Sequence, residues 1–177
     1  HKGVTGAVEF LRELHLGGHP QVGRQVAVIG GGNSAIDAAQ CALRLGAGEV
    51  TIYYRRTQAD MPALKQEVEA ALKEGVQIVE LVAPIRFIGE ENHVRQLVLQ
   101  KMRLGDFDAG GRKKPVPILG SEYVVPADQV IAVIAEALHV APDFFLEYRL
   151  RQVASVLDQA PARRIRGAVY VSCAGRG

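Results

Sequence analysis

A cluster of glycines separates an apolar run from a run of small side chains between residues 25 and 46. Residues 25–29 are mostly apolar, which is typical of a strand buried on both faces of a parallel sheet. Gly30-Gly31-Gly32 follows, and residues 34–45 have the composition of a helix that ends at Gly46. A second apolar run at residues 49–54 completes a strand–helix–strand unit, whose two strands are expected to be parallel neighbours.

The glycine spacing fits G-x-G-x-x-G/A. Glycine is needed where the chain turns out of the strand and again where a side chain would block a pyrophosphate, and a small third residue lets the helix lie close to the strand. Backbone N–H groups and the helix dipole would then face the phosphates. Because the motif lies between a strand and a helix, dinucleotide binding is favoured over a glycine-rich turn that binds nothing. The candidate residues are Gly30, Gly31, Gly32, Asn33, Ser34 and Ala35.

Two arginines end the second strand, where the adenosine ribose lies in this architecture. Arg55 comes 25 residues after Gly30, and Arg56 follows it. A site for NAD or FAD usually has a carboxylate here, whereas a guanidinium can grip a 2′-phosphate. The alternative is a pair of solvated surface arginines. The register with the glycine loop favours the phosphate, and therefore predicts NADP(H).

The remaining chain predicts an α/β fold: a Rossmann-like three-layer dinucleotide-binding domain with a parallel sheet plus an antiparallel β-meander. An amphipathic helix is expected over residues 5–15, with Val8, Leu11 and Leu14 on one face. A second helix is expected from an N-cap at Asp60 to Gly75, with a buried stripe of Leu64, Val68, Ala71 and Leu72. Strands are expected at residues 76–81 and 129–134, and the meander at 85–125. We expect one domain over 1–177, with a core at 1–135 and a helix (143–159) and further strand (168–172) in the segment 136–177.

The composition excludes several classes of function. A net charge of +2 gives no argument for nucleic-acid binding, and the basic run at residues 112–114, which has no interleaved aromatic residues, predicts a solvated turn. No apolar run reaches about 18 residues, so no membrane span is expected. The sequence shows no metal-ligand spacing, no redox cysteine pair and no nucleophile–histidine grouping, so no catalytic or metal-binding residue is predicted.

Five segments together resemble the NADPH-binding domain of the glutamate synthase small (beta) subunit family. They are KGVTGAVEFLRELHLG, VGRQVAVIGGGNSAIDAA, LGAGEVTIYYRR, MPALKQEVEAALKEGV and GRKKPVPILGSEYVVPADQVI. The likeness covers residues 2–134. It implies a flavoprotein in which the NADPH domain is inserted within an FAD-binding domain. By this resemblance, residues 30 and 32–35 hold the pyrophosphate, and Arg55 and Arg56 hold the 2′-phosphate.

The resemblance also implies hydride transfer from NADPH to FAD, with iron–sulfur clusters and a large catalytic subunit receiving the electrons. Because the sequence shows neither a membrane span nor a signal-peptide start, a cytoplasmic location is expected. The family's FAD loop is absent from this chain, and Gly-x-x-Pro is replaced by Ala135-Glu136-Ala137-Leu138. We therefore expect a fragment of a larger flavoprotein that is inactive by itself. Two alternatives stay open: a non-catalytic NADP(H)-binding regulatory or scaffold module whose partner surface is residues 136–177, and, disfavoured by the missing acid, a loop that holds FAD itself.

Overall fold

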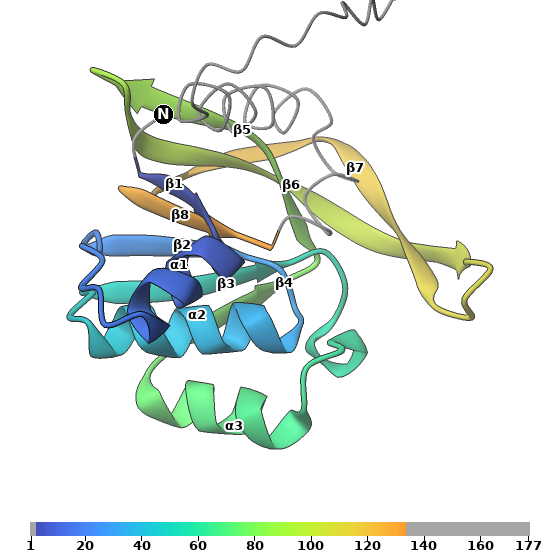
Figure 1. Ribbon diagram of the computed structural model, residues 1–177. Coiled ribbons are helices and arrows are strands. Elements are labelled where there is room, and N and C mark those ends of the chain that lie inside the picture. The colour runs from blue at the N-terminus through green and yellow to red at the C-terminus, as the bar shows by residue number, and fades with distance from the viewer. Residues whose placement is uncertain (1–2, 134–177) are drawn as a thin grey trace, which may run out of the picture. The chain divides into compact units, whose positions relative to one another are not determined.

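A computed structural model describes residues 3–133, which form two β-sheets and three α-helices (Figure 1). All of these elements belong to one unit of the chain, His1–Phe145. The expected segment 136–177, with its helix and strand, lies outside the described residues.

The larger sheet is parallel and has the strand order β1-β8-β2-β3-β4. Its strands are β1 (Val4–Gly6), β2 (Gln25–Ile29), β3 (Glu49–Tyr54), β4 (Gln77–Glu80) and β8 (Gln129–Ala132). In the register, Val28 of β2 lies between Ile52 of β3 and Ile131 of β8, and all three side chains are fully buried. Such central strands are apolar on both faces because both faces are covered. The predicted strand–helix–strand unit is thus confirmed.

Three helices pack on one face of this sheet: α1 (Ala7–His15), α2 (Asn33–Arg44) and α3 (Lys65–Glu74) (Figure 1). Helix α2 buries Ala35, Ile36, Ala38, Ala39 and Ala42 completely. Because four of these five side chains are single methyl groups, the helix axis can lie close to the strands. Gly46 and Gly75 follow α2 and α3 with φ of 101° and 108°, so both helices end at left-handed glycines as the sequence predicts.

The smaller sheet is the expected antiparallel meander, with the order β5-β6-β7. Its strands are β5 (Val82–Glu90), β6 (His93–Phe107) and β7 (Lys113–Pro126). It covers the face of the parallel sheet opposite the helices (Figure 1). Alternation along β3 fits this arrangement, because Ile52 packs in the helix-side core whereas Thr51 and Tyr53 share a pocket with Val125 and Pro126 of β7. The α/β three-layer prediction is therefore confirmed.

Two predictions about the first helix were wrong. Residues 5 and 6 belong to strand β1 rather than to the start of the helix, because residues 4–6 pair with Val130–Ala132 at the sheet edge. In α1 the buried side chains are Ala7 and Phe10, while Val8 is 66% exposed.

Asp60 is not the N-cap of the helix that follows it. Its carboxylate accepts hydrogen bonds from the N–H and hydroxyl of Thr57, which closes the 3₁₀ helix η1 (Gln58–Asp60), and α3 begins only at Lys65. Because of this later start, Leu64 and Leu72 are exposed, and only Val68 and Ala71 of the predicted stripe are buried.

The beginnings of β2 and β8 are joined by side chains as well as by the strand ladder. The Asp128 carboxylate accepts the N–H groups of Arg24 (3.1 Å) and Gln25 (2.8 Å), and the Gln129 side-chain oxygen accepts the N–H of Gly23 (2.8 Å). These bonds satisfy backbone donors that precede the ladder, so they fix where β2 enters the sheet.

We predict that Asp128→Ala lowers the free energy of unfolding by about 1–3 kcal/mol, because it leaves two backbone donors without their acceptor. Urea denaturation measures this change. Asp106→Ala, at an exposed aspartate of β6, is the control and should change stability by less than about 0.5 kcal/mol. Equal stabilities of the two variants would contradict the prediction.

Candidate functional site

The glycine loop leaves β2 in a conformation that packing with β3 requires. Gly30 has φ of 141°, a value that L side chains rarely adopt. A Cβ on Gly31 would lie 2.5 Å from the ring of Tyr54, so this position has no room for a side chain. At Gly32, in contrast, a Cβ would meet no atom within 4 Å. The space beside Gly32 is therefore open to a bound group.

Helix α2 begins at this open position. Gly32 is its N-cap, and the Gly32 carbonyl accepts the N–H groups of Ala35 (2.9 Å) and Ile36 (3.2 Å). Among the described residues, the N–H groups of Gly32, Asn33 and Ser34 donate to no protein acceptor. Unsatisfied N–H groups at the positive end of a helix dipole form a site for an anion.

The segment after β3 folds back onto the glycine loop. Ala63 donates its N–H to the carbonyl of Gly31 (3.2 Å), and Leu64 donates its N–H to the side-chain oxygen of Asn33 (3.0 Å). The Tyr54 hydroxyl donates to the carbonyl of Asp60 (3.0 Å) within the same segment. The side chain of Asn33 therefore holds the second loop in place, while its backbone N–H remains at the helix end.

The two predicted arginines lie in different surroundings. Arg55 is half-buried and lines a small pocket together with Gly30 and Val82. Arg56 is 4% exposed and reaches the β6–β7 hairpin, where its Nε donates to the carbonyl of Lys113 (2.8 Å) and its Nη2 donates to the Asp108 carboxylate (3.1 Å). The fold thus places Arg55 beside the glycine loop and engages Arg56 with protein acceptors.

Two carboxylates near Arg56 are held in the charged form. Hydrogen bonds from the N–H groups of Arg112 and Gly110 are foremost in lowering the pKa of Asp108, and the charges of Arg112 and Arg56 add to the effect. The hydrogen bond from the Thr57 hydroxyl is the largest cause of the lowered pKa of Asp60, and the charges of Arg56 and Lys113 contribute. Several cationic side chains therefore lie near the end of β3, together with ionised carboxylates that accept hydrogen bonds.

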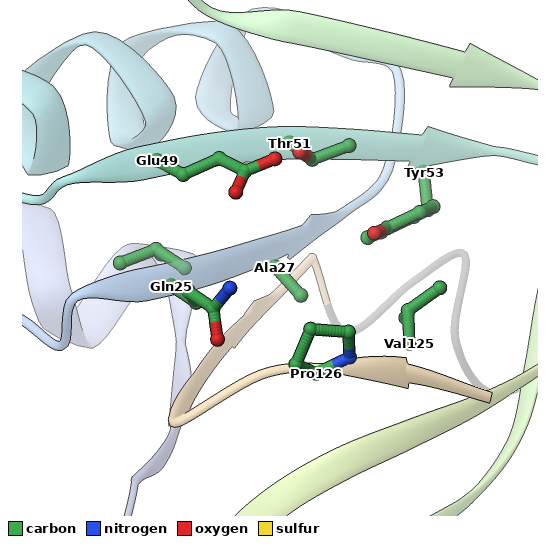
Figure 2. Close-up of a pocket in the computed structure, with 8 residues that line it drawn as sticks. Gln25, Ala27, Glu49, Thr51, Tyr53, Val125 and Pro126 are labelled. Atoms are coloured by element: carbon green, nitrogen blue, oxygen red, sulfur yellow. The ribbon is translucent and has the colours of Figure 1, made fainter.

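Figure 2 shows a second hollow, a cavity of about 150 Å³ on the meander side of the parallel sheet. It is lined by polar side chains of Gln25, Glu49, Thr51 and Tyr53 and closed by Pro126 and its neighbour on β7. Burial foremost raises the pKa of Tyr53 to about 12, so this phenol stays protonated at neutral pH. The cavity extends toward the starts of β2 and β3, away from the glycine loop.

Sequence reasoning missed both this cavity and the contacts of Arg56. In β3 the polar residues 49, 51 and 53 alternate with apolar ones. This period of two could have indicated that one face of the strand is not covered by helices. For Arg56 no local signal existed, since Asp108 and Lys113 are 52 and 57 residues away along the chain.

Neither a metal-binding cluster nor a membrane-spanning helix lies within residues 3–133. No group of three or more His, Cys, Asp or Glu side chains in this part of the chain is placed to hold a metal ion. Within the same residues, no helix is both long enough and apolar enough to cross a membrane. Contact of the eight predicted site residues with a nucleotide stays a prediction.

Comparisons with known proteins agree with the fold. Pyridine nucleotide-disulphide oxidoreductases match residues 3–134. The chain is 44% identical over 134 residues to the NADPH-Fe(3+) oxidoreductase subunit beta of Geobacter sulfurreducens, covering 75% of this chain and 20% of that one. It is 40% identical over 122 residues to the small chain of the NADPH glutamate synthase of Halomonas elongata, covering 69% and 26%.

A solved structure shares the fold at low identity. FprA of Mycobacterium tuberculosis in complex with NADPH superposes with a TM-score of 0.58 and 18% identity, over 73% of this chain and 44% of that one. The chain thus spans a fifth to a quarter of the two relatives named above. From its match over residues 3–134 and these relatives, the chain belongs to the pyridine nucleotide-disulphide oxidoreductase family and is related to the small subunits of glutamate synthase.

Proposed function

We propose that this chain is the NADPH-binding domain of a glutamate synthase small-subunit-like flavin oxidoreductase. In this role it presents NADPH for hydride transfer to FAD, which is held by a domain outside the chain. The observation that carries the proposal is the open space at Gly32, which is bordered by the unsatisfied N–H groups of Gly32, Asn33 and Ser34. Arg55 lies beside Gly30 in the same loop region.

The residues present fit such a nucleotide. A pyrophosphate carries the negative charge that a helix N-terminus favours, and glycine at position 32 leaves room for it. Gly30, Gly31 and Ala35 shape this loop without needing to touch the ligand, since a side chain on Gly31 would collide with Tyr54. Arg55 beside Gly30 is suited to a 2′-phosphate, because a guanidinium forms paired, charge-assisted hydrogen bonds.

Arg56 would contribute to the same phosphate with the N–H groups that it does not give to Lys113 and Asp108. Two of its five donors are engaged with these acceptors. Its charge is partly offset by Asp108, so we assign the larger share of the discrimination between NADPH and NADH to Arg55.

The chemistry supplied by bound NADPH is a hydride, and the chain's own residues bind and orient its donor. Orientation alone accounts for much of the rate of such transfers, so a domain without an acid–base residue is sufficient. The names of the relatives as subunits, and the small share of their length that this chain spans, support further domains and a partner subunit in the complete protein. Iron–sulfur clusters, a large catalytic subunit and a cytoplasmic location stay predictions.

We predict that Gly32→Val weakens binding of NADPH and NADH alike, by about tenfold to a hundredfold, because a branched side chain enters the space of the shared pyrophosphate and displaces its hydrogen bonds. Calorimetric titration is the measurement, since the chain has no tryptophan. Stability should fall by no more than about 1 kcal/mol, the cost of a poorer N-cap. Unchanged affinity for both nucleotides would refute the pyrophosphate site.

We predict that Arg55→Ala weakens NADPH binding by about tenfold or more and leaves NADH binding unchanged, because only NADPH carries the 2′-phosphate. Arg12→Ala removes the same charge from an exposed position of α1 and is the matched control. Equal affinities of the unmodified chain for NADPH and NADH would argue against NADP(H) altogether. In that case a different dinucleotide becomes the better hypothesis.

A further inference from the structure

The tip of the β6–β7 hairpin, residues 108–113, is organised around one carboxylate. Asp108 accepts the N–H groups of Gly110 and Arg112 through its side chain, each at 2.9 Å. Its backbone N–H donates to the carbonyl of Arg112 (2.7 Å), and its carbonyl accepts the N–H of Gly111 (3.0 Å). These four bonds close the turn on itself, so the tip has a defined shape although it is exposed.

Arg56 fixes this tip at the carboxyl end of β3. Its two donor contacts reach both sides of the turn, the Asp108 carboxylate at its start and the Lys113 carbonyl at its end. The guanidinium is buried, and a buried cation is stable only where its donors are satisfied. Figure 1 shows the hairpin extending past the edge at which β2 and β3 end. Through Arg56 the tip is held at the end of β3, from which the chain continues into the segment that contacts the glycine loop.

Three consecutive cations, Arg112, Lys113 and Lys114, stand where the tip leads into β7. The Lys113 ammonium lies 6.0 Å from the centroid of the Phe107 ring, and its charge acts on Asp60 across the end of β3. Lys114 is the next residue on the strand, so its side chain points to the opposite face. Both lysines are exposed. Of the two, Lys113 is the one whose charge reaches the segment between β3 and α3.

Two carboxylates near this end of β3 accept hydrogen bonds from groups other than Lys113. One oxygen of Asp60, Oδ2, accepts both hydrogen bonds of Thr57, and the Asp108 carboxylate accepts hydrogen bonds from Gly110, Arg112 and Arg56. The ammonium of Lys113, in contrast, takes part in no ion pair among the described residues. Lys113 is thus an available cation at the end of the strand where a phosphorylated ribose would lie.

We propose that the hairpin tip forms one wall of the 2′-phosphate site, with Lys113 as a cation that contacts the phosphate and Arg56 as the positioning residue that holds the tip in place. This inference rests on the proposed function and adds to it a specificity determinant from the second sheet. The basic run predicted to be a solvated turn then has a ligand.

The test compares Lys113→Ala with Lys114→Ala in the full 177-residue chain, by calorimetric titration with NADPH and with NADH. Lys113→Ala should raise the dissociation constant for NADPH about tenfold and leave that for NADH unchanged, the effect of one lost charge-assisted hydrogen bond. Lys114→Ala should change either constant less than about twofold, as expected for a screened surface charge. Lys113→Arg should retain the preference for NADPH.

If the two alanine variants weaken NADPH binding equally, the effect comes from the overall positive charge of the hairpin rather than from a contact of Lys113, and the assignment is overturned. The absence of any effect of Lys113→Ala would overturn it as well. The outcomes also separate this inference from the proposed function. If Arg55→Ala loses the preference for NADPH while Lys113→Ala keeps it, only the hairpin assignment fails. If the unmodified chain has no preference for NADPH, the proposed function itself fails.

The role of Arg56 is tested by Asp108→Asn, which keeps the size of the side chain but removes its charge. If Arg56 acts by holding the tip, loosening the tip should lower the ratio of NADPH to NADH affinity several-fold without changing NADH binding. If the direct contribution of its remaining N–H groups to the phosphate outweighs its hold on the tip, the same variant releases Arg56 and the ratio rises. A rise would overturn the positioning role.

Discussion

The ring of Tyr54 determines where the glycine loop lies, because it occupies the space that a side chain at position 31 would need. The ring is 1% exposed, and its hydroxyl donates to the segment that follows β3. That segment returns to the loop through the N–H groups of Ala63 and Leu64. The direction of α2, and with it the orientation of its unsatisfied N–H groups, therefore depends on a contact between an aromatic ring and a glycine. The preferences of the loop sequence alone would not fix it.

Arg56 is a second constraint of the same kind, acting between the two sheets. A guanidinium removed from water is unfavourable unless acceptors surround it, and here the acceptors on Asp108 and Lys113 both belong to the hairpin. The burial of one cation thus sets where the meander lies at the carboxyl end of β3. A surface arginine would leave the hairpin tip free to vary in position, and the basic residues that follow Asp108 would have no fixed relation to β3.

The local features of the fold were predictable because their causes are local. The glycine spacing, the alanines of α2 and the left-handed glycines after α2 and α3 each act within a few residues, and the meander followed from its turns. Strand β1 was not predictable, since three residues gain their conformation only by pairing with Val130–Ala132. The same holds for Arg56: whether an arginine at a strand end is solvated or buried depends on Asp108, which is distant in sequence. Its neighbour Arg55 also follows the end of β3 in the sequence, yet it lies beside Gly30.

Under the proposed function, recognition divides between two parts with different tolerance for change. The helix end meets the pyrophosphate that all dinucleotides share, and it is fixed by packing: Gly30 against Val133, Gly31 against Tyr54, and both loops against each other. The hairpin tip is exposed and is held by the contacts of one buried side chain. Exposed loop positions tolerate substitution at little cost in stability, whereas buried ones do not. A change in the preferred dinucleotide is therefore cheaper at the tip than at the glycine loop, and it leaves the site of the pyrophosphate intact.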